Sequence, residues 1–170
     1  MRDLVAVPLF LPALAAWAVV GALAARRIGR RLGIHPVHAF GLVVSLGIVL
    51  SATLTPQGAA LVRGATGPAT CDLSRLGFAS IHDYLVLGDI QGNVLMFIPL
   101  GVALALLPAS RNRAALVLAG ALVPVCIETT QLMLGFLDRA CQSGDVVDNL
   151  LGLGIGLALG AVVGVVRGRI

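Results

Sequence analysis

Charged residues are scarce in this chain, and lysine is absent. Only 12% of the 170 residues are charged, and all twelve basic residues are Arg, whereas a soluble globular domain carries about 25% charged residues. Hydrophobic residues make up 58% of the chain, and its mean hydropathy is +1.00. One small globular core cannot bury this much apolar surface, but a bilayer can cover it. The composition therefore excludes an ordinary soluble domain and predicts an integral membrane protein.

Aromatic residues are also few, at 4% of the chain, so bases would find few side chains on which to stack. The pI of about 9.8 comes from Arg residues that cluster beside apolar runs. This placement indicates membrane topology and argues against a phosphate-binding face, so we expect no nucleic-acid partner. The chain also lacks a P-loop, a zinc-ligand spacing and a convincing Ser-His-Asp set. No common catalytic motif therefore identifies a reaction.

Five apolar runs can be read as membrane spans, each of which needs about 20 residues. They cover residues 4–25, 37–54, 91–108, 114–134 and 145–166, and the third is short and contains Pro99. A polar, Gly-rich stretch over residues 55–91 forms the longest loop. We find no internal repeat and no second domain. The sequence predicts one all-α polytopic membrane domain over residues 1–170, with about five transmembrane helices.

The first run has a competing interpretation as a cleavable signal peptide, because Ala22 and Ala24 give an A-x-A-like site. The run is longer than a usual signal segment, and its basic cluster lies on the C-terminal side, so we predict a retained helix. Five spans place eight Arg residues, at 26–31, 111–113 and 167–169, on one side of the membrane. Only Arg2, Arg63, Arg75 and Arg139 fall on the other side. This bias predicts an outside N-terminus and a cytoplasmic C-terminus in a bacterial cytoplasmic membrane.

Two of the three cysteines lie outside the cytoplasm in this topology. Cys71 is in the long loop, and Cys141 is in the short loop before the last run. Disulfides persist outside the cytoplasm, so we predict a Cys71–Cys141 bond; two unrelated thiols are the alternative. Cys126 lies within the fourth run, where we expect a small buried apolar residue.

Polar residues within apolar helices are costly, so each needs a partner, access to water or a function. Glu128 lies near the outer end of the fourth run, roughly 9 Å deep, and Gln131 follows on the same face. Pro124, one turn before Glu128, could kink the helix and open a cavity. The structural alternative is a hydrogen-bonded clasp between helices, with Glu128 protonated.

The last run begins with a second polar group. Asp145, Asp148 and Asn149 have the spacings of residues on one helix face, although capping of the helix alone could explain Asp145. Arg139, in the preceding loop, could pair with these carboxylates or bind a phosphate. Asn93 opens the third run at the same level.

The topology gathers these residues at one membrane face, and we predict an outward-facing pocket of acids and amides there. Glu128 and Asp145 are the candidate acid/base pair. The candidate binding residues are Asn93, Gln131, Arg139, Asp148 and Asn149. We expect no resident metal, although this oxygen-rich set could hold Mg²⁺ or Ca²⁺. Separately, Gly152, Gly156, Gly160 and Gly164 recur every four residues, which predicts close packing of the last helix against another.

Three blocks of the sequence resemble the VanZ-like family. They are Asn93-Val-Leu-Met-Phe97-Ile-Pro99-Leu-Gly101, then Ile127-Glu128-Thr-Thr-Gln131 followed by Arg139, Asp145 and Asn149, and finally Leu150-Leu-Gly152-Leu-Gly154-Ile-Gly156. The resemblance covers about residues 90–160 and implies a small polytopic membrane protein. The founding member is associated with resistance to teicoplanin, a lipoglycopeptide that binds cell-wall precursors outside the cell. This chain departs from the family pattern at Gln142, where an acid is common, and at Asp148, where an apolar residue is usual.

Three functions fit these features. The first is binding of an envelope lipid, a lipid-linked wall precursor or a lipoglycopeptide, with a role in teicoplanin resistance. The second is an enzyme that modifies a lipid-linked envelope precursor, with Glu128 and Asp145 as acid and base and Arg139 as the phosphate or sugar anchor. The third is a non-catalytic structural protein, in which the polar residues only lock helices together. The resistance role rests on the resemblance alone.

Overall fold

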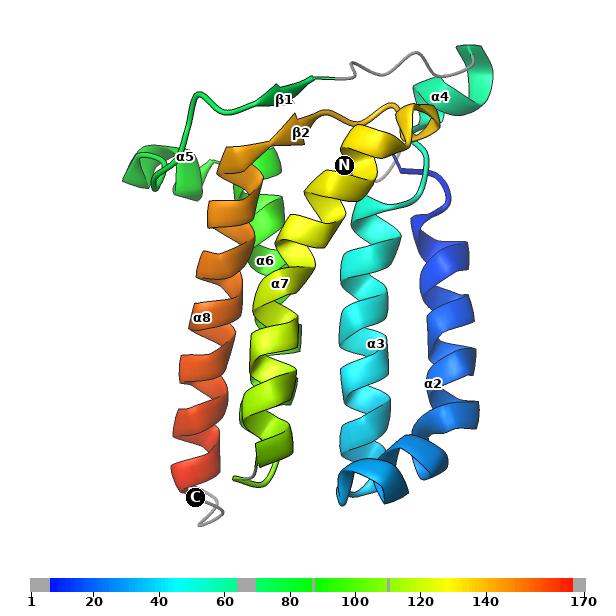
Figure 1. The fold of residues 1–170 in the computed structure, drawn as a ribbon, viewed down its shortest axis with the longest axis vertical. Coiled ribbons are helices and arrows are strands. Elements are labelled where there is room, and N and C mark those ends of the chain that lie inside the picture. The colour runs from blue at the N-terminus through cyan, green and yellow to red at the C-terminus, as the bar shows by residue number, and fades with distance from the viewer. Residues whose placement is uncertain (1–6, 64–69, 87, 110, 167–170) are drawn as a thin grey trace.

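The computed structural model describes residues 7–63, 70–86, 88–109 and 111–166 (Figure 1). Arg2, Arg167 and Arg169, which contribute to the predicted topology, lie outside the described residues. Within the described part, the long elements are helices, and they run alternately up and down through the molecule (Figure 1). They are α2 (Phe10–Leu32), α3 (Pro36–Thr53), α6 (Asp89–Ala105), α7 (Arg111–Met133) and α8 (Ser143–Val166).

Four of these helices, α2, α3, α7 and α8, are long and apolar enough to cross a membrane. The fifth, α6, is a shorter apolar helix of 17 residues, which rises about 25 Å. Its length is near the lower limit of known spans. The prediction of an all-α polytopic membrane protein is confirmed, whereas the direction in which the helices cross stays a prediction.

The short elements all lie at one end of the bundle (Figure 1). They are α4 (Gly58–Arg63), β1 (Cys71–Asp72), α5 (Ile81–Leu85), the 3-10 helix η1 (Gly135–Leu137) and β2 (Cys141–Gln142). Strands β1 and β2 pair in parallel, with Cys71 opposite Cys141. The segment that contains β1 and α5 therefore lies across the beginning of α8. We call residues 70–86 the strap.

Helix α2 continues seven residues beyond the predicted end of its apolar run, from Ala25 to Leu32. Arg is a good helix former, and the Arg side chains in these turns are exposed. The helix ends at Gly33, whose φ of 67° lies in the left-handed region, and the Gly33 N–H donates to the Gly29 carbonyl. The change in hydropathy therefore marked where the apolar surface ends and not where the helix ends.

Helices α6 and α8 pack with their backbones in contact. A methyl group at Gly156 would lie 2.9 Å from the Gly101 Cα atom, and one at Gly160 would lie 2.6 Å from the Ala105 Cβ atom. Gly152 and Gly164 are also buried. The predicted small-residue packing face is therefore confirmed, and it fixes α6 and α8 as one closely packed pair.

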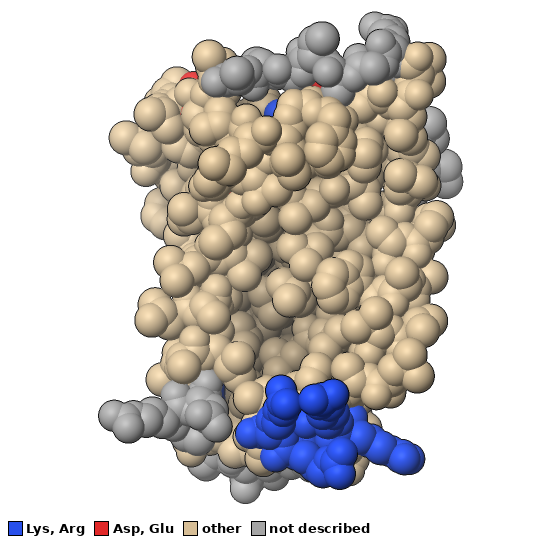
Figure 2. Space-filling view, turned by 45° about the vertical axis from the view of Figure 1, so that its right-hand side comes forward, with Lys and Arg blue, Asp and Glu red and all other residues tan. Residues whose placement is uncertain are grey.

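Large apolar side chains cover much of the outer surface between the two ends, as a lipid-facing protein requires (Figure 2). Leu23, Leu118 and Val162 are all more than 60% exposed. Cys126 also lies on this surface, so the expectation that it is buried was wrong. Both the lipid-facing surface and the helix interior are apolar, so hydropathy alone does not distinguish the two faces.

The charges are divided between the two ends. Figure 2 shows a patch of basic side chains at one end, which we call the arginine end; the Arg residues of α2 lie there, whereas Arg75 and Arg139 lie at the other end. All described acidic residues lie in or beside the elements of the other end, from Asp72 in β1 to Asp148 in α8. We call that end the acidic end.

Candidate functional site

The seven residues predicted to form a pocket all lie at the acidic end. We call them the polar cluster: Asn93, Glu128, Gln131, Arg139, Asp145, Asp148 and Asn149. Asn93 comes from α6, Glu128 and Gln131 come from α7, and Arg139 comes from the loop after η1. The other three residues come from α8. Five of them are buried, while Arg139 and Asp145 are half-buried. The structure therefore brings the predicted residues to one place, and their roles in binding or catalysis stay predictions.

Asp148 is fully buried and is held by two residues of the strap. Arg75 Nη1 and Nη2 donate to its two carboxylate oxygens at 3.1 and 2.5 Å, and the Tyr84 hydroxyl donates to Oδ1 at 2.9 Å. The hydrogen bond to Asp148 raises the pKa of Arg75 above its ordinary value. Burial raises the pKa of Tyr84, so its hydroxyl keeps the proton that it donates. Sequence reasoning missed both partners of Asp148.

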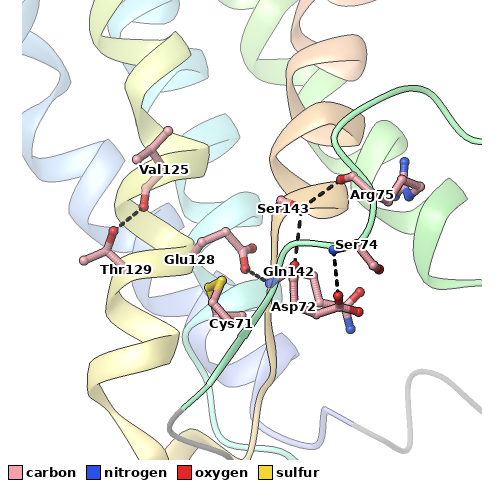
Figure 3. Close-up of a disulfide and its surroundings, with 10 residues drawn as sticks. Cys71, Asp72, Ser74, Arg75, Val125, Glu128, Thr129, Gln142 and Ser143 are labelled. Carbon is pink, nitrogen blue, oxygen red and sulfur yellow. Dashed lines mark hydrogen bonds between the residues drawn. A yellow bond between two sulfur atoms is a disulfide. The ribbon is translucent and has the colours of Figure 1, made fainter.

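The close approach of Arg75 depends on a glycine at the start of α8. A methyl group at Gly144 would lie 2.6 Å from Arg75 Cζ and Nε, so any larger residue would displace the guanidinium. The preceding residue fastens the strap: Ser143 Oγ donates to the backbone carbonyl of Arg75 at 2.8 Å and of Asp72 at 3.3 Å (Figure 3). In the sequence, Gly144 just before Asp145 could have suggested that another group packs closely there. It could not have shown that this group is Arg75.

A disulfide joins Cys71 and Cys141, so the predicted bond is confirmed. It links the strap to the segment just before α8 (Figure 3). Beside it, the backbone N–H of Gln142 donates to Glu128 Oε2 at 2.7 Å. Glu128 therefore connects α7 to β2. Gln142 contributes its backbone N–H to this contact, while its side chain is exposed.

Gln131 and Arg139 bind the C-terminal end of α3. Gln131 Nε2 donates to the Thr53 carbonyl at 3.0 Å, and Arg139 Nε and Nη2 approach the Thr55 carbonyl at 3.4 and 3.5 Å. Carbonyls at a helix end lack partners within the helix and need external donors. No sequence pattern indicated this role for α3, because a backbone carbonyl is the same in every residue.

Of the two alternatives for Arg139, pairing with a carboxylate is not seen among the described residues, and binding of a phosphate stays a prediction. Among the described residues, the Arg75–Asp148 contact is the ion pair of this end, and Arg139 has no carboxylate within 4 Å. Burial lowers the pKa of Arg139, and the charges of Asp89 and Asp145 oppose this effect. Arg139 is therefore a half-buried cation whose hydrogen bonds to protein are long.

Two amide side chains of the cluster have unused hydrogen-bonding atoms. Asn93 Nδ2 and Asn149 Oδ1 are buried, and neither has a partner of standard geometry among the residues that the structure describes. The Asn93 side chain is close enough to the Asp145 carboxylate to interact with it as a weak hydrogen-bond donor, so Asn149 Oδ1 is the more isolated of the two atoms. Buried polar atoms without partners are rare, and each one needs an explanation.

The described residues contain no group of three or more His, Cys, Asp or Glu side chains arranged to hold a metal ion. The suggested Mg²⁺ or Ca²⁺ site stays a prediction. An open cavity at the cluster also stays a prediction, because most of its members are buried.

Comparison with known proteins gives one match. A family model described as VanZ/LLP1 matches residues 42–164, which is more than half of the chain. The match begins within α3, extends beyond the expected residues 90–160, and includes the whole polar cluster. No curated protein and no solved structure matches this chain.

Proposed function

This chain belongs to the VanZ/LLP1 family, and from that premise we propose that it binds a polar head group at the polar cluster. The head group belongs to an envelope lipid, a lipid-linked cell-wall precursor or a lipoglycopeptide. The protein acts in a bacterial cytoplasmic membrane, with the acidic end outside, and contributes to glycopeptide resistance.

The observation that supports this proposal is the buried amide oxygen Asn149 Oδ1, which has no hydrogen-bond partner among the described residues. Asn93 Nδ2 also lacks a partner of standard geometry, although its side chain interacts with the Asp145 carboxylate. A buried polar atom without a partner costs about 1–3 kcal/mol. A bound head group with hydroxyl or amide groups would supply both the acceptor and the donor that these atoms need. Lipid and wall-precursor head groups have such groups.

Access to the cluster supports the same proposal. Arg139 and Asp145 are only half-buried, so the cluster reaches the surface through them. Arg139 has long hydrogen bonds to a backbone carbonyl, and its guanidinium could take a better acceptor, such as a phosphate or carboxylate. Asp145 could accept a hydrogen bond from a hydroxyl or an ammonium group.

Asn93→Ala tests the proposal, with Gln91→Ala as the control. Both changes remove an amide from the first turns of α6, but only Asn93 belongs to the cluster. We expect Asn93→Ala to weaken binding of a purified lipid-linked wall precursor about fivefold to tenfold. Gln91→Ala should bind like the wild type. Binding is measured by native mass spectrometry of the purified chain, and teicoplanin susceptibility is measured in cells that express each variant. Equal binding by all three proteins would contradict the proposal.

A second candidate is catalysis, because Glu128 and Asp145 lie close enough for their charges to interact. Such a pair could serve as general acid and base on a lipid-linked precursor. Glu128→Gln keeps an oxygen that can accept from the Gln142 N–H, so we expect this variant to fold. Envelope lipids extracted from cells with wild type, Glu128→Gln or no protein separate the two functions. A lipid that changes only with the wild type indicates an enzyme, whereas unchanged lipids with altered resistance indicate binding.

Among the members of the cluster, Asp148 has the clearest structural role. Its two oxygens accept three hydrogen bonds from Arg75 and Tyr84. A carboxylate with its charge compensated in this way holds the strap on α8 and has less capacity for a ligand. We therefore propose that Asp148 positions the cluster, while the remaining members contact the ligand.

A further inference from the structure

A surface hollow with two His side chains lies at the arginine end, opposite the polar cluster. This hollow of about 730 Å³ is formed where the connection between α2 and α3 meets the ends of α6 and α8. Its volume falls within the range of about 300–1,000 Å³ typical of ligand pockets. His35 and His38 are its titratable side chains, and apolar residues such as Ile34, Leu106 and Leu107 line the rest.

Four Arg side chains at the arginine end form no ion pair with an acid among the residues that the structure describes. They are Arg26, Arg27, Arg30 and Arg31, which are exposed on the last turns of α2. The sequence contains no Asp or Glu between residues 4 and 71. Figure 2 shows these Arg side chains as a continuous patch at the base of the molecule. Their counter-charges must therefore come from outside the described part of the chain.

We propose that this hollow binds the head group of one anionic phospholipid from the adjoining leaflet. His35 and His38 line the site, and Arg30 and Arg31 lie within one helical turn of Gly33 and Ile34, which also line it. His35 Nδ1 accepts a hydrogen bond from the Val37 N–H, so this ring is held in place at the start of α3. The lipid phosphate accepts hydrogen bonds from the His and Arg side chains.

The apolar part of the lining favours a lipid over a soluble anion. Ile34, Val37 and Leu107 offer a surface that the glycerol and the first methylene groups of an acyl chain can cover, whereas free phosphate would leave it in contact with water. The hollow also lies at the ends of membrane-spanning helices, where lipid head groups are found. Basic pockets between transmembrane helices bind such head groups in other membrane proteins.

Two double variants distinguish a defined site from general attraction to a charged surface. Arg30→Gln/Arg31→Gln and Arg26→Gln/Arg27→Gln each remove two positive charges from α2. The second pair lies four residues earlier, about 6 Å further along the helix axis from the hollow. A defined site therefore predicts unequal effects, whereas diffuse attraction predicts equal effects.

The experiment measures phospholipid bound to the purified full-length chain by native mass spectrometry. Phosphatidylglycerol is compared with phosphatidylcholine of the same acyl chains. We expect the wild type to hold one phosphatidylglycerol about tenfold more tightly than phosphatidylcholine. Arg30→Gln/Arg31→Gln should lower this affinity about tenfold, and Arg26→Gln/Arg27→Gln less than about threefold. Equal losses in the two double variants, or no preference between the lipids, would overturn the proposal.

Two further measurements test whether the hollow is the binding site and whether it prefers a lipid to free phosphate. His38→Leu removes a polar side chain from the lining without changing the Arg residues, and it should also lower phosphatidylglycerol retention. If it does not, the hollow is not the binding site. Millimolar inorganic phosphate should leave the bound lipid in place, and displacement by phosphate would contradict a lipid-specific site. Size-exclusion chromatography confirms that each variant is folded before it is compared.

Discussion

Arg75 in the strap and Asp148 in α8 form a bidentate ion pair across 73 residues of sequence. The Asp148 side chain is fully buried, whereas that of Arg75 is 30% exposed. The pair therefore joins a surface segment to the interior of the bundle. Helix α8 also carries Asp145 and Asn149. The ion pair therefore holds the strap next to these members of the polar cluster.

Replacement of Arg75 should strongly destabilise the protein. Arg75→Met leaves the Asp148 carboxylate buried without its cation, and removal of one partner from a buried pair costs about 3 kcal/mol or more. We expect a lower midpoint of thermal unfolding in detergent. The double variant Arg75→Met/Asp148→Asn removes the charge as well and should recover part of this loss. Equal midpoints for the single and double variants would show that the unpaired Asp148 charge is not the cause of the loss.

Tyr84→Phe should cost about 1 kcal/mol at neutral pH, because it removes the hydrogen bonds of the hydroxyl with Asp148 and the Ala79 N–H. The effect should also depend on pH. The folded pKa of Tyr84 is raised by burial, so its stabilising contribution is fully present below the unfolded pKa of about 10. The contribution decreases as the pH rises toward the folded value.

Unfolding of the wild type and Tyr84→Phe across alkaline pH tests this prediction. The difference in unfolding free energy should be constant from neutral pH to about pH 9 and should narrow above it. A difference that widens with pH would mean that the folded state favours the phenolate, contrary to this prediction.

Loss of the Cys71–Cys141 disulfide should destabilise the protein, by up to about 4 kcal/mol for a loop of 70 residues. Cys71→Ser/Cys141→Ser and reduction of the wild type should lower the unfolding midpoint by similar amounts. Cys126→Ser is the control, because this free cysteine lies on the outer surface. A reductant that shifts the double variant as much as the wild type would assign the effect to another group.

An added methyl group should destabilise the protein on the face of α8 that packs against α6, but not on the opposite face. In Gly156→Ala, the new Cβ would lie 2.9 Å from the Gly101 Cα atom, so α6 and α8 must separate. Overpacking of this kind costs about 1–3 kcal/mol. Gly154→Ala meets no atom within 4 Å and should be neutral or slightly stabilising. Unfolding midpoints in detergent measure both, and similar losses in the two variants would indicate a helix-propensity effect.

The sequence predicted the features that follow from the periodicity of residue types or from the free-energy cost of polar residues in a membrane. The apolar runs located the five long helices, the four-residue glycine spacing predicted the α6–α8 contact, and the two loop cysteines predicted their bond. The cluster was also predictable in outline. Buried acids and amides such as Glu128 and Asn149 stand out in an apolar helix, and alternating topology sets them at one end.

The partners of those residues were not predictable. Arg75 and Tyr84 lie in a long loop, where no periodicity indicates direction or contact. The Thr53 and Thr55 carbonyls belong to the backbone, which is the same for every residue. Arg139 is closer in sequence to Asp145 and Asp148 than Arg75 is, so sequence distance favoured the wrong ion pair. A hydrogen bond between a loop and a helix depends on the three-dimensional path of the loop.

Helix α2 packs mainly against α3 and contributes no residue to the polar cluster. The family match also begins after α2, at residue 42. Substitutions in α2 can consequently change the arginine end without changing any residue of the polar cluster. A chain without its first helix would lose the four Arg residues of α2, yet it would still contain every residue of the polar cluster at the other end. If both proposals hold, substitutions in α2 can change lipid binding at the arginine end without changing the polar cluster.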